Sequence, residues 1–313
     1  MHSRLFQRCT LACISAALVL IFGATLSAAK KRDASSQPAQ AMAAAPDEGG
    51  RTFVGSQQCE ACHDAVAKSF GSSPHAVTLQ KTRVTPEARG CESCHGPGSA
   101  HVEGGGDKSK IFRFGEATAE RINQRCLTCH EANVNQRQFT RSEHAQNGVS
   151  CTTCHSVHQP AKREYLLKAS QPNLCFSCHT AQRADFMKPF KHRVLEGLVN
   201  CTDCHNPHGT VTTAQVRPTP SQGDACVKCH SDKRGPFVYE HEPVRSEGCT
   251  SCHFPHGSTN PRMLLTARVN ALCLQCHSQI PTGVHSQNNN FRQSCIICHA
   301  NIHGSNNHRL LFR

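Results

Sequence analysis

The strongest chemical pattern in the sequence is Cys-x-x-Cys-His, which occurs ten times. Its first cysteines stand at positions 59, 91, 126, 151, 175, 201, 226, 249, 273 and 295. Positions i, i+3 and i+4 of one helical turn lie on the same face. Two thiols at i and i+3 can therefore form thioethers with the two vinyl groups of one haem, while the histidine at i+4 ligates its iron. The sequence predicts ten covalently bound haems c.

The motifs, numbered 1 to 10 in chain order, define the predicted cofactor residues. The attachment cysteines are Cys59, Cys62, Cys91, Cys94, Cys126, Cys129, Cys151, Cys154, Cys175, Cys178, Cys201, Cys204, Cys226, Cys229, Cys249, Cys252, Cys273, Cys276, Cys295 and Cys298. The proximal iron ligands are His63, His95, His130, His155, His179, His205, His230, His253, His277 and His299. A disulfide framework, zinc ribbons and thioredoxin-like motifs also use paired cysteines, but none of them requires a histidine after every pair.

The remaining histidines indicate a second axial ligand for each iron. Each of the nine segments between consecutive motifs contains one further histidine, and the tail contains two, His303 and His308. Because histidine is a standard haem ligand, we expect bis-His irons, with His303 rather than His308 as the tenth distal ligand. The distal ligands would be His75, His101, His144, His158, His192, His208, His241, His256, His285 and His303. The sequence does not say which distal histidine serves which haem.

The motifs also group in pairs. After each even-numbered motif another histidine follows quickly, whereas after each odd-numbered motif it comes shortly before the next motif. Two copies are nearly the same, CTDCHNPHG at 201–209 and CTSCHFPHG at 249–257. We therefore divide residues 53–313, the predicted decahaem domain, into five two-haem modules.

Composition argues against an ordinary protein core. The chain has 313 residues, no Trp and 5% aromatic residues, and its mean hydropathy is −0.47. Such a chain buries too little side-chain surface to fill its own interior. We expect a multihaem cytochrome fold that is mostly irregular, with little or no β-sheet and short helices such as 117–130 and 266–277.

The N-terminus has the features of an export signal. A basic start precedes an apolar run too short for a confident membrane span, and small residues follow. We expect residues 1–29 to be a signal peptide and residues 30–52, rich in Ala, Ser, Gln and Pro, to be a flexible leader. No later segment is suited to be a transmembrane helix. The formal net charge of +12 is scattered and not interleaved with aromatics, so we expect no nucleic-acid binding and interpret Lys and Arg as partners of haem propionates.

Two stretches carry a resemblance to a known family. The segment GPFVYEHEPVRSEGCTSCHFPHGSTNPRML at 235–264 and the closing ICHANIHGSNNH resemble the periplasmic decahaem c-type cytochromes of the MtrA/DmsE type. The resemblance covers residues 53–313 and implies an elongated chain of ten bis-His haems. It matches His241, His256 and His303 to distal ligands. It also implies electron transfer across the outer membrane inside a porin-like β-barrel, between a periplasmic donor and an extracellular cytochrome or acceptor.

These observations favour an electron-transfer protein rather than an enzyme. A haem that activates a substrate needs an open iron position, and twenty histidines for ten irons leave no obvious one. The expected location is the periplasm, with insertion into an outer-membrane barrel as one possibility. The alternatives within the same chemistry are a soluble periplasmic carrier that donates to a separate terminal reductase, a multihaem reductase and a subunit of a cytochrome filament.

Overall fold

A computed structural model of the chain describes residues 50–80, 89–160, 164–218, 225–280, 285 and 293–313. The signal peptide expected at 1–29, and most of the leader expected at 30–52, lie outside the described residues. The expected division into five modules stays a prediction.

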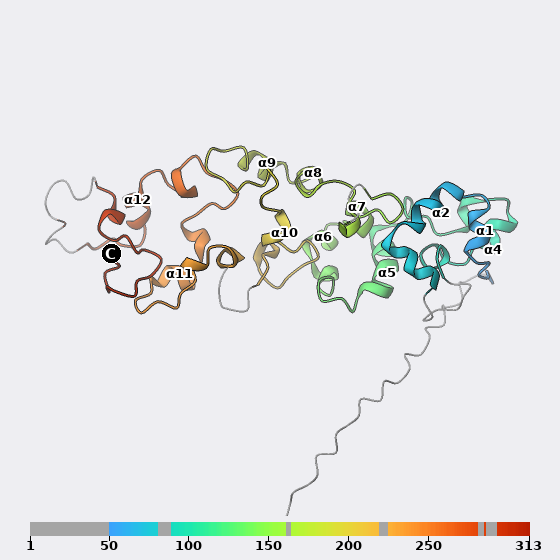
Figure 1. Ribbon diagram of the computed structural model, residues 1–313, viewed down its shortest axis with the longest axis horizontal. Helices are drawn as coiled ribbons and strands as arrows, with labels where there is room; N and C mark the ends of the chain where they lie inside the picture. Colours follow the sequence, from blue (N-terminus) through green and yellow to red (C-terminus); the bar gives the residue numbers. More distant parts are fainter. Residues whose placement is uncertain (1–49, 81–88, 161–163, 219–224, 281–284, 286–292) are drawn as a thin grey trace, which may run out of the picture. The chain divides into compact units, whose positions relative to one another are not determined.

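Short helices joined by irregular chain make up the described residues (Figure 1). The α-helices are α1 (Ser56–Glu60), α2 (Asp64–Gly71), α3 (Glu92–His95), α4 (Ser99–Glu103), α5 (Ala119–His130), α6 (Glu143–Gln146), α7 (Cys151–Cys154), α8 (Gln171–Phe176), α9 (Thr180–Asp185), α10 (Cys201–Cys204), α11 (Glu242–Ser246) and α12 (Val269–Cys273). The 3₁₀ turns are η1 (Pro74–Gln80), η3 (Lys108–Lys110), η4 (Phe139–Arg141), η5 (Glu164–Leu166), η6 (Thr213–Gln215), η7 (Ala225–Lys228), η8 (Ser231–Lys233), η9 (Cys249–Ser251), η10 (Pro261–Met263) and η11 (Cys295–Ile297). The helix expected at 117–130 is confirmed, whereas the one expected at 266–277 is shorter.

Every motif begins on a helical turn. In nine motifs the backbone N–H of the histidine donates to the carbonyl of the first cysteine at 2.9 to 3.0 Å, and the motif at 126–130 ends helix α5. This i+4 to i bond is the geometry that puts both thiols and the imidazole on one face. The local prediction from the motif spacing agrees with the structure.

Among the described residues, backbone pairing outside helices is limited to five isolated antiparallel bridges. They join His155 to Leu167, Phe190 to Ser258, His205 to Val216, Tyr239 to Ser305 and His253 to Leu264. The expected fold class, mostly irregular with short helices and without a sheet, is therefore confirmed for the described part of the chain.

The side-chain core is thin. Within the described ranges, one cluster of buried apolar residues is found, and it consists of Phe176, Phe186 and Val194. The most buried large side chain is a charged one, Glu92, whose carboxylate accepts hydrogen bonds from the backbone N–H groups of Val54 (3.0 Å), Gly55 (2.8 Å) and Gly98 (2.8 Å). Polar bonds to backbone thus replace apolar packing at the start of the domain, as a chain poor in large apolar residues requires.

Three turns contain pairs of residues in the left-handed region, none of them glycine. The pairs are Tyr165–Leu166, Ala214–Gln215 and Arg262–Met263, with φ between 52° and 59°. A residue with a Cβ adopts this conformation at a cost of about 1–2 kcal/mol. Each turn follows an even-numbered motif by nine or ten residues, so the same strained conformation recurs at equivalent places in the repeat.

Candidate haem-binding sites

All ten motif histidines lie opposite one further histidine. The ring centroids of each pair are 5.9 to 6.4 Å apart. The pairs are His63 with His101, His95 with His158, His130 with His75, His155 with His208, His179 with His144, His205 with His256, His230 with His192, His253 with His303, His277 with His241 and His299 with His285.

This spacing suits one iron between two imidazoles. An imidazole nitrogen lies about 2 Å from a first-row metal ion that it ligates, so two imidazoles on opposite sides of one iron have ring centroids about 6 Å apart. Rings in direct stacking contact would be closer. None of the twenty motif cysteines forms a disulfide, and they stand on the same turns as their histidines. The residues therefore fit haem c, whose iron gains and releases one electron.

The pairing crosses the boundaries between the two-haem modules. His144 follows motif 3 but faces His179 of motif 5, and His208 follows motif 6 but faces His155 of motif 4. The same exchange recurs at each of the four boundaries, where two pairs join consecutive modules. At the two ends the pairs close within one module, as with His63 and His101. Sequence reasoning could not find this order, because the partners are distant along the chain.

The tail histidines have different surroundings. His303 faces His253 of motif 8, with centroids 6.2 Å apart. His308 instead stacks on Phe312 at 4.7 Å, and its Nδ1 accepts a hydrogen bond from the N–H of Leu310. Phe312 in turn lies 4.9 Å from the ring of His299. His308 therefore lies beside Phe312, which contacts the ring of His299, and it does not face a motif histidine.

In the even-numbered motifs a backbone carbonyl holds the motif imidazole. Because a carbonyl only accepts, Nδ1 carries the proton and Nε2 is free for a metal. The acceptors are Phe112 for His95 (2.9 Å), Tyr165 for His155 (2.6 Å), Ala214 for His205 (2.9 Å), Arg262 for His253 (2.8 Å) and Leu310 for His299 (2.6 Å). Three of these carbonyls belong to the left-handed turns. The strained conformation thus places a carbonyl where it accepts the hydrogen bond of the motif histidine.

At motifs 1, 5 and 7 the ring held in this way is the opposite one. His101 Nδ1 donates to the Asp107 carbonyl at 2.8 Å, His144 Nδ1 to the Pro207 carbonyl at 2.9 Å and His192 Nδ1 to the Pro255 carbonyl at 2.8 Å. Metal-bound histidines usually donate their second N–H to a carbonyl or carboxylate, which fixes the tautomer. That bond is thus present on one ring of most pairs.

Burial favours the neutral form of four rings in these pairs. Desolvation, followed by the nearby His155 ring, lowers the pKa of His208 to about 4. Desolvation is also the main cause that lowers the pKa of His95, His256 and His303. A neutral imidazole has a lone pair to give to iron, so the electrostatics of the sites agree with their geometry.

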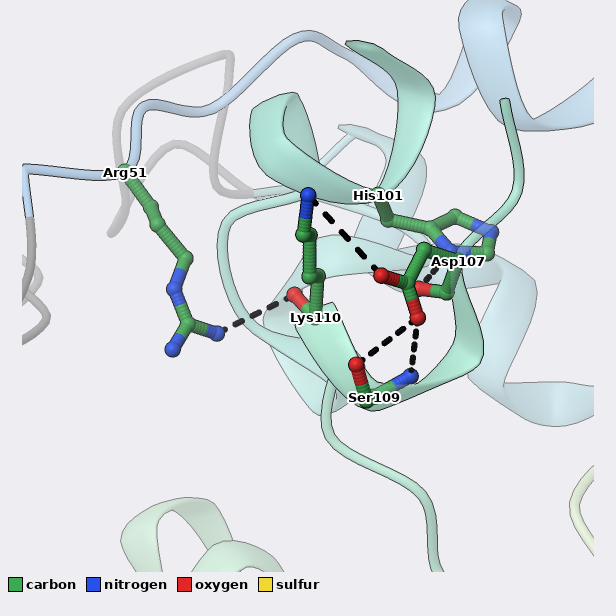
Figure 2. A network of polar contacts seen from close by, with 5 residues as sticks. All are labelled: Arg51, His101, Asp107, Ser109 and Lys110. Carbon is green, nitrogen blue, oxygen red and sulfur yellow. Dashed lines mark hydrogen bonds and ion pairs between the residues drawn. The ribbon is translucent and has the colours of Figure 1, made fainter. Parts of the chain in front are cut away.

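The first pair has its own polar support (Figure 2). The Asp107 carboxylate accepts hydrogen bonds from the N–H (2.9 Å) and the hydroxyl (2.7 Å) of Ser109, and it lies 3.8 Å from Lys110 Nζ. Arg51 donates to the Lys110 carbonyl at 3.0 Å. Because the Asp107 carbonyl also accepts from His101, this Gly-rich segment orients a ring opposite motif 1.

Consecutive motifs bring their sulfurs together. Within a module the first cysteines of the two motifs lie close enough that the second shifts the thiol pKa of the first: Cys59 with Cys91, Cys126 with Cys151, Cys175 with Cys201 and Cys273 with Cys295. Between modules the sulfurs are close enough to interact electrostatically: Cys94 with Cys126, Cys154 with Cys178, Cys204 with Cys226 and Cys252 with Cys273. These contacts join motifs 1 to 7, and motifs 8 to 10, in chain order.

Two family models match the repeated region. One describes a doubled CXXCH motif and matches residues 144–184, 192–235 and 241–281. The other describes cytochromes c554 and c-prime and matches residues 102–156. The doubled units join motifs 4 and 5, 6 and 7, and 8 and 9, so they span the module boundaries. Both models define the class of protein as a c-type cytochrome that binds several haems.

A full-length relative narrows the class. The multiheme cytochrome MtrA of Shewanella baltica is 37% identical over 298 residues, which is 89% of this chain and 87% of the relative. The c-type cytochrome NrfB of Escherichia coli is 29% identical over 35% of this chain and 65% of its own length. OmcB, a polyheme cytochrome of Geobacter sulfurreducens, is 25% identical over 58% of this chain and 26% of its own. The chain therefore belongs to the MtrA family of multihaem c-type cytochromes, and it is an electron-transfer protein that uses haem c.

Proposed function

We propose that all ten motifs carry a covalent haem c and that every iron has two histidine ligands, paired as the rings are paired in the structure. The observation that carries this proposal is that each of the ten motif histidines faces one other histidine ring at 5.9 to 6.4 Å. Irons closed on both sides exchange electrons without binding a substrate. His308 is left as the one spare histidine of the domain.

The ten haems form a chain that conducts in motif order. Support comes from the sulfur contacts, because each thioether marks the vinyl edge of its haem. Haems 1 and 2 meet through Cys59 and Cys91, and haems 2 and 3 through Cys94 and Cys126. Two kinds of junction therefore alternate, one within modules and one between them. Direction along the chain follows from the potentials at its two ends.

The cellular role we propose is the periplasmic and transmembrane part of an outer-membrane electron conduit. None of the helices in the described ranges has the length and apolar character that crossing a bilayer requires. The resemblance to the MtrA/DmsE decahaem family favours insertion into a porin-like barrel formed by a separate chain. The remaining partners would be a periplasmic donor and an extracellular cytochrome or acceptor.

Two measurements test the cofactor part. Intact mass should correspond to ten haems on the exported chain, and EPR of the oxidised protein should contain low-spin signals only. A mass with fewer haems would remove the motif interpretation at the missing sites. A substantial high-spin signal would mean an open iron, which is the outcome that a reductase predicts.

Purification from membranes tests the conduit part. The protein should be recovered with an outer-membrane barrel chain, and liposomes that contain the pair should pass electrons from an internal reductant to an external acceptor. The matched control is the barrel with apo-protein, which should not conduct. Recovery only in the soluble periplasm, without any barrel chain, would favour the carrier that donates to a separate reductase.

A further inference from the structure

At three of the four module boundaries, these hydrogen bonds also link neighbouring sites to each other. His144 faces motif 5, and its Nδ1 donates to the carbonyl of Pro207 at 2.9 Å. The next residue, His208, faces motif 4. The carbonyl that holds His144 and the backbone N–H of His208 therefore belong to the same peptide unit.

The same arrangement occurs at the next two boundaries. His192, opposite motif 7, donates to the Pro255 carbonyl at 2.8 Å, and His256 is opposite motif 6. His241, opposite motif 9, has a hydrogen bond with the backbone of Ile302, and His303 is opposite motif 8. In each case the histidine that donates the hydrogen bond faces the odd-numbered motif. The histidine that follows the acceptor residue in sequence faces the even-numbered motif.

A glycine after the second histidine makes the close approach possible. Gly209 has φ +99°, and a Cβ there would lie 2.7 Å from the Gln138 carbonyl oxygen. Gly257 has φ +150°, and its Cβ would overlap the Asp185 carbonyl oxygen. Gly304 has φ +139°, and its Cβ would overlap the Phe237 ring. Side chains are excluded at all three positions by both space and backbone conformation.

At two of these boundaries, the residue after the glycine pairs through its backbone with a residue of the neighbouring module. Ser258 exchanges hydrogen bonds with Phe190, at 2.8 and 3.2 Å, and Ser305 exchanges two with Tyr239, both at 2.8 Å. The acceptor carbonyl is thus fixed on a short, rigid contact between modules. Its position does not depend on a flexible side chain.

We propose that this junction hydrogen bond is a positioning element that sets the donor strength of the distal ligand at motifs 5, 7 and 9 and ties it to the loop that carries the distal ligand of the preceding haem. The proposal rests on the bis-His ligation given under the proposed function. Donation from Nδ1 makes the imidazole a stronger ligand for ferric iron, which lowers the reduction potential of that haem. At each of these three boundaries, one shared peptide unit therefore influences the reduction potentials of the two haems on either side.

Trans-hydrogen-bond NMR tests the bond directly in the full holoprotein. The protein is labelled with ¹⁵N-histidine and ¹³C-carbonyl proline and fully reduced, because low-spin ferrous haem is diamagnetic. Two ring Nδ1 atoms should couple to the same proline carbonyls that couple to the backbone nitrogens of His208 and His256. If ten low-spin haems are present and these ring couplings are absent, the junction bond is wrong while the proposed function stands. Missing or high-spin haems in the native protein would instead contradict the proposed function.

The variant Gly257→Ala tests the effect on potential. The new Cβ should push the Pro255 carbonyl away from His192 without removing a ligand, so ten low-spin haems are expected. One haem should become easier to reduce by about tenfold in its reduced-to-oxidised ratio, which is about 59 mV for a one-electron couple. The control is Gly197→Ala, where φ is also positive, +76°, but a Cβ meets nothing within 4 Å.

Equal potentials in Gly257→Ala and the native protein, or equal shifts in both glycine variants, would overturn the proposal. Gly209→Ala covers the case in which Gly257→Ala loses a haem or does not fold, because its Cβ meets the Gln138 carbonyl oxygen at a milder 2.7 Å. It should raise the potential of the haem at motif 5 in the same direction. If Gly209→Ala loses the coupling between His144 and Pro207 while the potential of the haem at motif 5 is unchanged, the hydrogen bond does not set that potential and the proposal is refuted.

Discussion

Even-numbered and odd-numbered motifs fix their imidazoles in different ways. At motifs 4, 6 and 8 the motif histidine donates to a carbonyl only nine or ten residues further along the chain. At motifs 5 and 7 the fixed ring is the opposite one, and the carbonyl lies 63 residues away. The even sites are thus organised by local chain, and the odd sites by contact between modules. Local disturbance should therefore stay at one even site, whereas a disturbed junction should reach two haems.

In the first module the ring opposite the odd-numbered motif is held by a nearby carbonyl of the same module. His101, opposite motif 1, is held by the Asp107 carbonyl only six residues away. No earlier module exists in the described chain to supply a ring for motif 1, so His101 of the same module supplies it and the segment 104–110 provides the carbonyl that holds it. Repeat proteins commonly need such atypical ends, since the terminal unit lacks one neighbour. The longer spacing between motifs 2 and 3 has this structural reason.

The largest effect should come from removing a distal ring. His303→Ala should open the iron at motif 8 and convert about one tenth of the haem to a high-spin form that binds carbon monoxide. EPR of the oxidised protein and optical titration of the reduced protein measure this change. His308→Ala is the matched control, because that ring stacks on Phe312 and faces no motif histidine. High-spin haem in the control, and none in His303→Ala, would reverse the assignment of the spare histidine.

The next effect concerns the local anchor of an even site. Proline holds φ near −65°, whereas Ala214 has φ 52°, so Ala214→Pro should move the carbonyl away from His205. The potential of the haem at motif 6 should then rise by about tenfold in its redox ratio, or about 59 mV. We expect the haem at motif 7 to keep its potential, because its opposite ring, His192, is held by the Pro255 carbonyl and not by this turn. Stepwise potentiometric titration with optical detection measures both.

The variant Ala214→Gly tests the same turn by relieving its backbone strain instead of breaking it. Glycine adopts positive φ without steric cost but loses more backbone entropy on folding. The variant should therefore keep the potential and be more stable by up to about 1 kcal/mol, seen as a higher midpoint in guanidinium unfolding. A shifted potential in this variant would mean that the alanine side chain, rather than the turn, orients His205.

Much of the site could be predicted from sequence, and the limits have physical causes. The motif spacing encodes its own helical turn, and one extra histidine in each gap indicated a second ligand. The pairing of rings depends on contacts between modules, which no local pattern records. The left-handed turns at Tyr165, Ala214 and Arg262 carry no glycine signal. Glu92 was also missed, since an acidic residue inside a motif is ordinarily taken to be exposed.

The smallest effect should come from the polar support of the first module. Asp107→Ala removes the carboxylate that caps residues 108–110 through Ser109, which should lower the local stability more than the loss of an exposed ion pair does. Lys110→Ala removes only an exposed ion pair at 3.8 Å and should cost less than about 0.5 kcal/mol. Hydrogen exchange of the amides at 104–112 measures both. Because His101 is held by the Asp107 backbone carbonyl and not by its side chain, the potential of the first haem should stay unchanged. A clear shift of that potential in Asp107→Ala would show that the end module is organised by side chains, unlike the local anchors of the even sites.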